Sequence, residues 1–156
     1  MDGETWVRME IQASQAYKPY IGSNYTPRLA VECRERGKKR SFSILLYSGL
    51  LESAHADSAF SPLPSGQRLL RTKIDDDKPR WRSWGQLTDG STYEYVGGGE
   101  TGMSMYPASR FIKDVFSARR LLVEFQPYEW NGTFTSEFEV QGLREEFDGH
   151  QECKAK

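Results

Sequence analysis

The sequence lacks the features that mark a membrane-spanning protein or a general binder of polyanions. Lys and Arg together number 21 and Asp and Glu 22, which gives a net charge of −1 over 156 residues. A nucleic-acid binder needs a clear surplus of basic residues. No apolar run approaches the roughly eighteen residues that cross a bilayer. With 37% apolar and 28% charged residues, the composition is typical of a soluble globular protein. We expect no nucleic-acid partner and no membrane span.

Histidine is also scarce, and no catalytic motif stands out. The two histidines, His55 and His150, lie in a loop of small residues and beside a predicted helix end. The chain has no Gly-x-Ser-x-Gly elbow, and neither cysteine has the setting of a reactive thiol. We therefore expect no catalytic residues, no cofactor and no metal site.

Two stretches suggest ligand binding, but their spacing does not fit the corresponding motifs. Asp75–Asp77 supplies carboxylates without the alternating ligand positions and closing Glu of a calcium loop. The glycine-rich run at 96–102 lacks the Gly-Lys-Ser/Thr ending of a phosphate loop. The first stretch predicts an acidic turn and the second a connection between strands.

Only two cysteines are present, Cys33 and Cys153, almost a full chain length apart. We expect a disulfide between them that fastens the last segment to an early strand, as in proteins outside a reducing cytoplasm. The bridge would close a loop of roughly 120 residues and contribute on the order of 5 kcal/mol in the chain-entropy model. Two free thiols in a cytoplasmic domain are the alternative.

The first residues, Met-Asp-Gly-Glu-Thr-Trp, contain neither a basic nor an apolar region of the kind found in a signal peptide. Taken alone, this start favours the cytoplasm. The cysteine pair instead favours a mature domain from which a signal peptide has been removed. We expect a periplasmic or secreted location.

An alternation of apolar and polar residues dominates the chain. Within 28–33, Leu29, Val31 and Cys33 share one face, which points the thiol toward the core. Eight segments are predicted as strands by this pattern: 5–12, 28–33, 41–47, 68–75, 80–87, 91–96, 120–126 and 133–140. The prediction is a mainly β fold, an antiparallel β-sandwich or partly open barrel of about eight strands.

Two stretches change to helical spacing. In 108–118, Phe111, Ile112, Val115 and Phe116 form one apolar face. In 142–149, Leu143 and Phe147 lie one turn apart. The fold therefore includes two short helices, and we expect residues 1–156 to form a single globular domain.

An aromatic and basic group flanks the predicted hairpin at 80–96. It contains Trp81 and Trp84, which an odd spacing sends to opposite faces of a strand, and it contains Tyr93 and Tyr95. Exposed aromatic rings beside Arg can stack on a sugar, a peptide or a partner protein. This group is the best candidate for a binding surface; the competing interpretation is one Trp in the core and the other covered by long side chains.

The order of these segments resembles the VasI-like family of small exported bacterial proteins associated with type VI secretion, and its uncharacterised relatives. The resemblance covers roughly 28–153 and includes the Leu-x-Val-x-Cys strand, the stretch Arg71-Thr72-Lys73-Ile74-Asp75 and the ending at Cys153. It implies the two cysteines and an Arg-x-x-x-Asp strand, which adds Arg71 and Asp75 to the candidate surface. It implies no catalytic residues.

These observations predict a non-catalytic binding or accessory module of the bacterial cell envelope, possibly secretion-associated. Its expected partner is a protein, peptide or glycan of the envelope. An envelope hydrolase is the alternative, with a site assembled from dispersed carboxylates such as Asp75, Glu94 and Glu124. That alternative requires a deep pocket in which at least two carboxylates converge.

Overall fold

The computed structural model describes residues 3–17, 24–48, 67–87, 92–95, 108–125 and 134–149. Its elements follow the order β1 (Glu4–Gln12), β2 (Arg28–Arg36), β3 (Lys39–Tyr47), β4 (Gln67–Ile74), β5 (Arg80–Gln86), β6 (Thr92–Tyr95), α1 (Ala108–Phe116), β7 (Arg120–Phe125), β8 (Phe134–Glu139) and α2 (Leu143–Asp148). The eight predicted strands and two predicted helices are all present.

The strands form one antiparallel sheet with the order β1-β2-β3-β6-β5-β4-β7-β8. Its two ends meet just after β1, where the Ser14 N–H donates to the Glu137 carbonyl of β8 at 2.9 Å. The sheet is therefore a nearly closed barrel, which confirms the predicted mainly β fold and selects the barrel over the sandwich.

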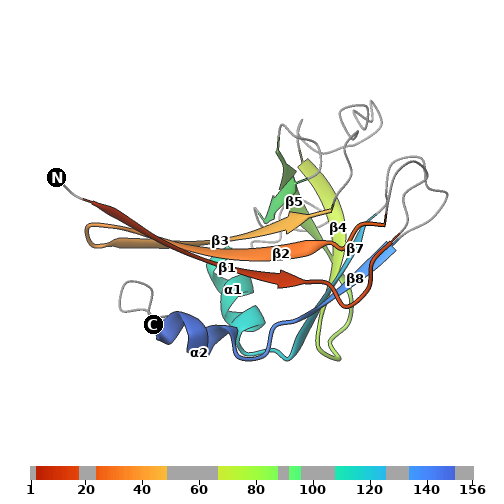
Figure 1. The fold of residues 1–156 in the computed structure, drawn as a ribbon. Coiled ribbons are helices and arrows are strands. Elements are labelled where there is room, and N and C mark those ends of the chain that lie inside the picture. The colour runs from red at the N-terminus through yellow and green to blue at the C-terminus, as the bar shows by residue number, and fades with distance from the viewer. Residues whose placement is uncertain are drawn as a thin grey trace.

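Strands β1, β2 and β3 continue beyond the closed part as a long ribbon, with α1 and α2 lying beneath it (Figure 1). The face of the sheet toward the helices is called the inner face here. On β2 it carries Leu29, Val31 and Cys33, all fully buried. The predicted alternation of this strand is thus correct. The turn that joins β2 to β3 contains Gly37 with φ 59°, a left-handed conformation that glycine adopts without strain.

Aromatic side chains join the helices to the ribbon. Phe42 of β3 makes edge-on contacts with Phe116 of α1 and Phe147 of α2, with ring centroids 5.7 Å and 6.0 Å apart. Phe116 and Phe147 lie 5.6 Å from each other. Helix α2 begins after Gly142, whose φ of 89° turns the chain sharply from β8 toward the ribbon. This cluster holds the C-terminal helix against the inner face.

Candidate functional site

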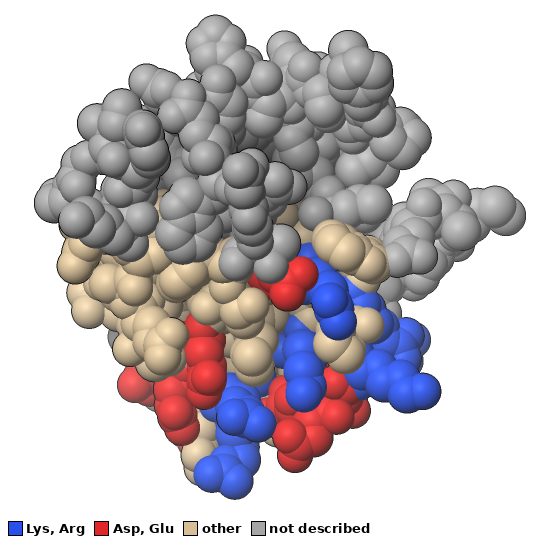
Figure 2. All heavy atoms as spheres, turned by 90° about the vertical axis from the view of Figure 1, so that its right-hand side faces the viewer, with Lys and Arg blue, Asp and Glu red and all other residues tan. Residues whose placement is uncertain are grey.

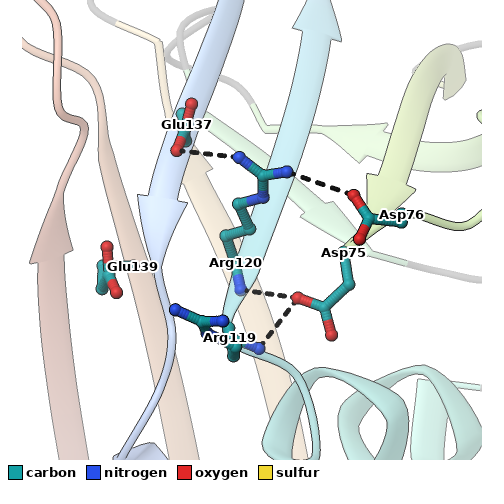
Figure 3. Close-up of a pocket in the computed structure, with 6 residues that line it drawn as sticks. All are labelled: Asp75, Asp76, Arg119, Arg120, Glu137 and Glu139. Carbon is teal, nitrogen blue, oxygen red and sulfur yellow. Dashed lines mark hydrogen bonds and ion pairs between the residues drawn. The ribbon is translucent and has the colours of Figure 1, made fainter.

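A polar pocket of about 450 Å³ lies at one end of the barrel, where β4, β7 and β8 end or begin. Its lining side chains are Asp75, Asp76, Arg119, Arg120, Glu137 and Glu139 (Figure 3). Of these, the sequence placed Asp75 in the candidate surface and Asp76 only in a predicted acidic turn. The others come together because the register pairs β7 with both β4 and β8.

Asp75 binds backbone groups at the start of β7. Its Oδ1 accepts the N–H groups of Arg119 and Arg120 at 2.9 Å and 3.0 Å, and its own N–H donates to the Arg120 carbonyl at 3.1 Å. Its φ of 48° is a left-handed conformation that Asp tolerates better than most residues. This carboxylate therefore closes the β4–β5 turn onto β7.

The remaining charges of the pocket largely compensate one another. The Arg120 guanidinium lies between two carboxylates, 3.3 Å from Asp76 and 3.8 Å from Glu137, as Figure 3 shows. On the face drawn in Figure 2, basic and acidic side chains are likewise interleaved. Such a pocket can hold a small polar or zwitterionic group by ion pairs, but Asp75, Asp76 and Glu137 already bind groups of Arg119 or Arg120.

Within the described ranges, no group of three or more His, Cys, Asp or Glu side chains is arranged to hold a metal ion. Both helices that the structure describes are too short and too polar to cross a bilayer. The histidines, the glycine-rich run at 96–102 and Cys153 lie outside the described residues.

The predicted aromatic surface is not assembled as a surface. Trp84, Tyr93 and Tyr95 are buried in the core, whereas Trp81 is 41% exposed. The odd spacing of the two Trp residues does send them to opposite faces, as predicted. Tyr93 and Tyr95 point to the inner face because the register places Tyr95 opposite Trp84. The Trp84 and Tyr95 ring centroids are 5.3 Å apart, and the Phe111 ring of α1 stacks on Tyr95 at 4.1 Å.

A buried arginine accompanies these aromatics. Arg82 donates from Nε to the Thr72 hydroxyl at 2.7 Å, and its guanidinium lies 5.1 Å from the centre of the Phe111 ring. Burial raises the pKa of the Tyr95 phenol, while its hydrogen bond with Arg82 acts in the opposite direction. Arg82 shares the inward face of β5 with Trp84, two residues later, but a charged side chain gives no sequence signal that this face is the buried one.

On the outer face, Trp81 is aligned with two charged residues. The register places Arg71 of β4 directly between Trp81 of β5 and Glu124 of β7. Arg71 and Glu124 form an ion pair at 3.8 Å, and the Arg71 side chain is 44% exposed. Trp81, Arg71 and Glu124, named here the outer row, are what the structure retains of the predicted binding surface.

The dispersed carboxylates of the hydrolase alternative fall on separate rows of the sheet. Glu94 of β6 pairs with Gly85 of β5, which pairs with Gln67 of β4. Glu124 of β7 pairs with Arg71, four residues further along β4. Asp75 lies four residues beyond Arg71. Four residues of strand span about 13 Å, so the three carboxylates do not converge.

A second set of charged side chains lies on the outer face of the ribbon. Arg8 donates to Glu32 at 2.9 Å, to Glu10 at 2.6 Å and to the Tyr47 hydroxyl at 2.6 Å. Arg34 also reaches Glu32, at 3.2 Å, so this buried carboxylate has two cationic partners. Sequence reasoning missed this network; the available signal was that Arg8 and Glu10 alternate onto the polar face of their strand.

Hydrogen bonding within this network shifts one carboxyl pKa. The bond from Arg8 is the largest cause that lowers the pKa of Glu10, burial opposes it, and the nearby Arg28 adds to the lowering. The ionised form of Glu10 is therefore favoured in the folded protein.

Cys33 is fully buried on the inner face, as the alternation of its strand predicted. Because Cys153 lies outside the described residues, the Cys33–Cys153 bridge stays a prediction.

The fold and these sites define a class: an antiparallel, nearly closed β-barrel with two helices under an extended ribbon. Comparison of the chain with protein-family models, with curated proteins and with solved structures finds no match. The VasI-like resemblance therefore stays an expectation.

Proposed function

We propose that this protein is a non-catalytic binding or accessory module of the bacterial cell envelope, which engages a protein, peptide or glycan through its outer row. The observation that carries the proposal is the exposed indole of Trp81 beside the Arg71–Glu124 ion pair. A flat aromatic ring next to a guanidinium and a carboxylate offers stacking and hydrogen bonding at one place.

The surroundings of the outer row also suit binding better than catalysis. Its two charged groups form an ion pair with each other, and they lie on three neighbouring antiparallel strands together with Trp81. A general acid or base would need a pKa matched to its task and a cleft that excludes water. An exposed aromatic anchor beside paired charges is instead typical of recognition.

The test is a binding screen of the purified protein against peptidoglycan fragments and envelope peptides, followed by titration calorimetry of any hit. Trp81→Ala is expected to weaken binding by about tenfold or more, as loss of an aromatic anchor does. Leu87→Ala is the matched control, because Leu87 is also an exposed apolar side chain at 39%. Equal binding by both variants and the unmodified protein would show that the outer row is not the binding surface.

An envelope location is part of the same proposal and has its own test. It is supported by the expected Cys33–Cys153 bridge, which persists in an oxidising compartment. Fractionation of cells that express the full gene product should recover it outside the cytoplasm. Recovery in the cytoplasm alone would contradict the envelope assignment. Secretion-system genes next to the gene for this protein would support the accessory role.

A further inference from the structure

The outer edge of β1, up to the point where β8 meets the chain at Ser14, carries the charged residues Glu4, Arg8 and Glu10 but lacks the other usual protections against pairing. Among the described residues, β1 pairs with β2 alone, through nine successive residue pairs that contain no bulge. The strand has no Pro and no Lys, and its inward side chains are Val7, Met9 and Ile11. Natural edge strands are commonly protected by bulges, prolines, lysines or inward charges.

Two hydrogen bonds show which backbone groups of β1 face this edge. The Ala13 N–H donates to the Pro27 carbonyl, on the β2 side, at 2.8 Å, whereas the Ser14 N–H points away from β2 to Glu137. Because the direction alternates along a strand, Trp6, Arg8 and Glu10 present their N–H and C=O groups to the outer edge.

The side chains along this edge are only partly covered. Trp6 is 55% exposed, the largest value for a large apolar residue in the described parts of the chain. Val7, Met9 and Ile11 are partly buried, whereas their neighbours across β2, Cys33, Val31 and Leu29, are fully buried. A further strand beside β1 would cover the exposed sides of these residues.

We propose that the occupant of this edge is a second copy of the same chain. Residues 6–12 of the two β1 strands pair antiparallel about a twofold axis that passes between the two Met9 residues, since β8 already occupies the edge at Ser14. This register sets Arg8 opposite Glu10 of the second copy, twice, and sets Val7 opposite Ile11 of the second copy. The edge is thus self-complementary in both charge and apolar surface, as a twofold interface requires.

Neighbouring registers are less favourable. A shift of the axis to position 8 places Arg8 opposite Arg8, and a shift to position 10 places Glu10 opposite Glu10. Like charges directly opposite each other destabilise a strand pair. An axis between two neighbouring positions, such as 8 and 9, sets residues whose backbone groups face the edge opposite residues whose backbone groups face β2. No ladder of hydrogen bonds can then form. The pairing rests on β1 alone and does not depend on the proposed function of the outer row.

The first test is the mass of the unmodified protein in solution, by light scattering or sedimentation over a range of concentrations. We expect a dimer that dissociates on dilution. Glu10→Pro removes an edge N–H without touching a bond to β2, and it should weaken dimerisation by about tenfold or more. Glu10→Gln keeps that N–H and should weaken it less. Circular dichroism of each variant reports whether the barrel is intact.

A cross-linking test checks the register. Met9→Cys should give a covalent dimer on oxidation, because residues at the axis lie side by side. Ile11→Cys is the matched control on the same face, since two copies of position 11 lie four residues apart along the strands and should not cross-link. A protein that stays monomeric at every concentration would overturn the proposal. Equal cross-linking at positions 9 and 11 would overturn the register.

Discussion

Asp75 and Arg120 are joined by two reciprocal hydrogen bonds that involve the backbone of both residues. The Asp75 Oδ1 accepts the Arg120 N–H at 3.0 Å, and the Asp75 N–H donates to the Arg120 carbonyl at 3.1 Å. The pair ties the end of β4 to the beginning of β7, 45 residues later. Asp75, which the sequence placed in the candidate binding surface, thus also has a structural role.

Replacement of Asp75 by Ala should therefore destabilise the fold. The variant leaves the N–H groups of Arg119 and Arg120 without their acceptor and places a less tolerant residue at φ 48°. We expect a loss of about 1–3 kcal/mol in the free energy of unfolding, measured by urea denaturation. Asp75→Asn keeps an acceptor oxygen and tolerates the conformation, so it should lose less. An unchanged midpoint for Asp75→Ala would contradict this role.

The aromatic cluster of Phe42, Phe116 and Phe147 should decide whether α2 docks. Phe147 is fully buried, so Phe147→Ala should lower the free energy of unfolding by about 3–5 kcal/mol. Proteolysis of the C-terminal helix should become faster in the variant. Glu146→Ala, an exposed change one residue earlier in the same helix, is the control and should have little effect.

The cysteine pair predicts that the purified protein, denatured without reductant, shows no reactive thiol. Reduction should lower the free energy of unfolding by up to about 5 kcal/mol, since the bridge would close a loop of roughly 120 residues. Thiol titration and denaturation with and without reductant provide both measurements. Two free thiols per chain would remove the case for export and favour the cytoplasmic alternative.

Glu10 should contribute to the acid sensitivity of the protein. In the folded protein the pKa of Glu10 lies below the ordinary value of 4.5 for a glutamate, chiefly because Arg8 donates a hydrogen bond to it, so folding favours the ionised carboxylate. The resulting stabilisation is complete above that value and is lost as the pH falls through the folded pKa. Glu10→Gln should therefore flatten the decline of stability below about pH 4.5. Parallel pH profiles for the variant and the unmodified protein would show that Glu10 has no such role.

Local patterns predicted the elements because they depend on neighbours along the chain. The alternation of Leu29, Val31 and Cys33 marks an inner face whatever lies beneath it, and the spacing of Phe111 and Val115 marks a helix. The odd spacing of Trp81 and Trp84 is a property of any strand. These features needed no knowledge of distant contacts.

The candidate site needed the tertiary structure. Nothing in the stretch Thr92–Tyr95 shows that both Tyr rings turn inward; the register that sets Tyr95 opposite the buried Trp84 places them there, and Phe111 of α1 stacks on Tyr95. The outer row exists only because the register aligns Trp81, Arg71 and Glu124 from three strands.

The sequence by itself thus determined the strands, the helices and the opposite faces of Trp81 and Trp84, because periodicity is a local property. The tertiary structure decided which of these faces became core, that Asp75 binds the backbone at the start of β7, and that β1 pairs with β2 alone among the described strands. Those outcomes depend on strand order and register, which are set by contacts between residues far apart in the chain.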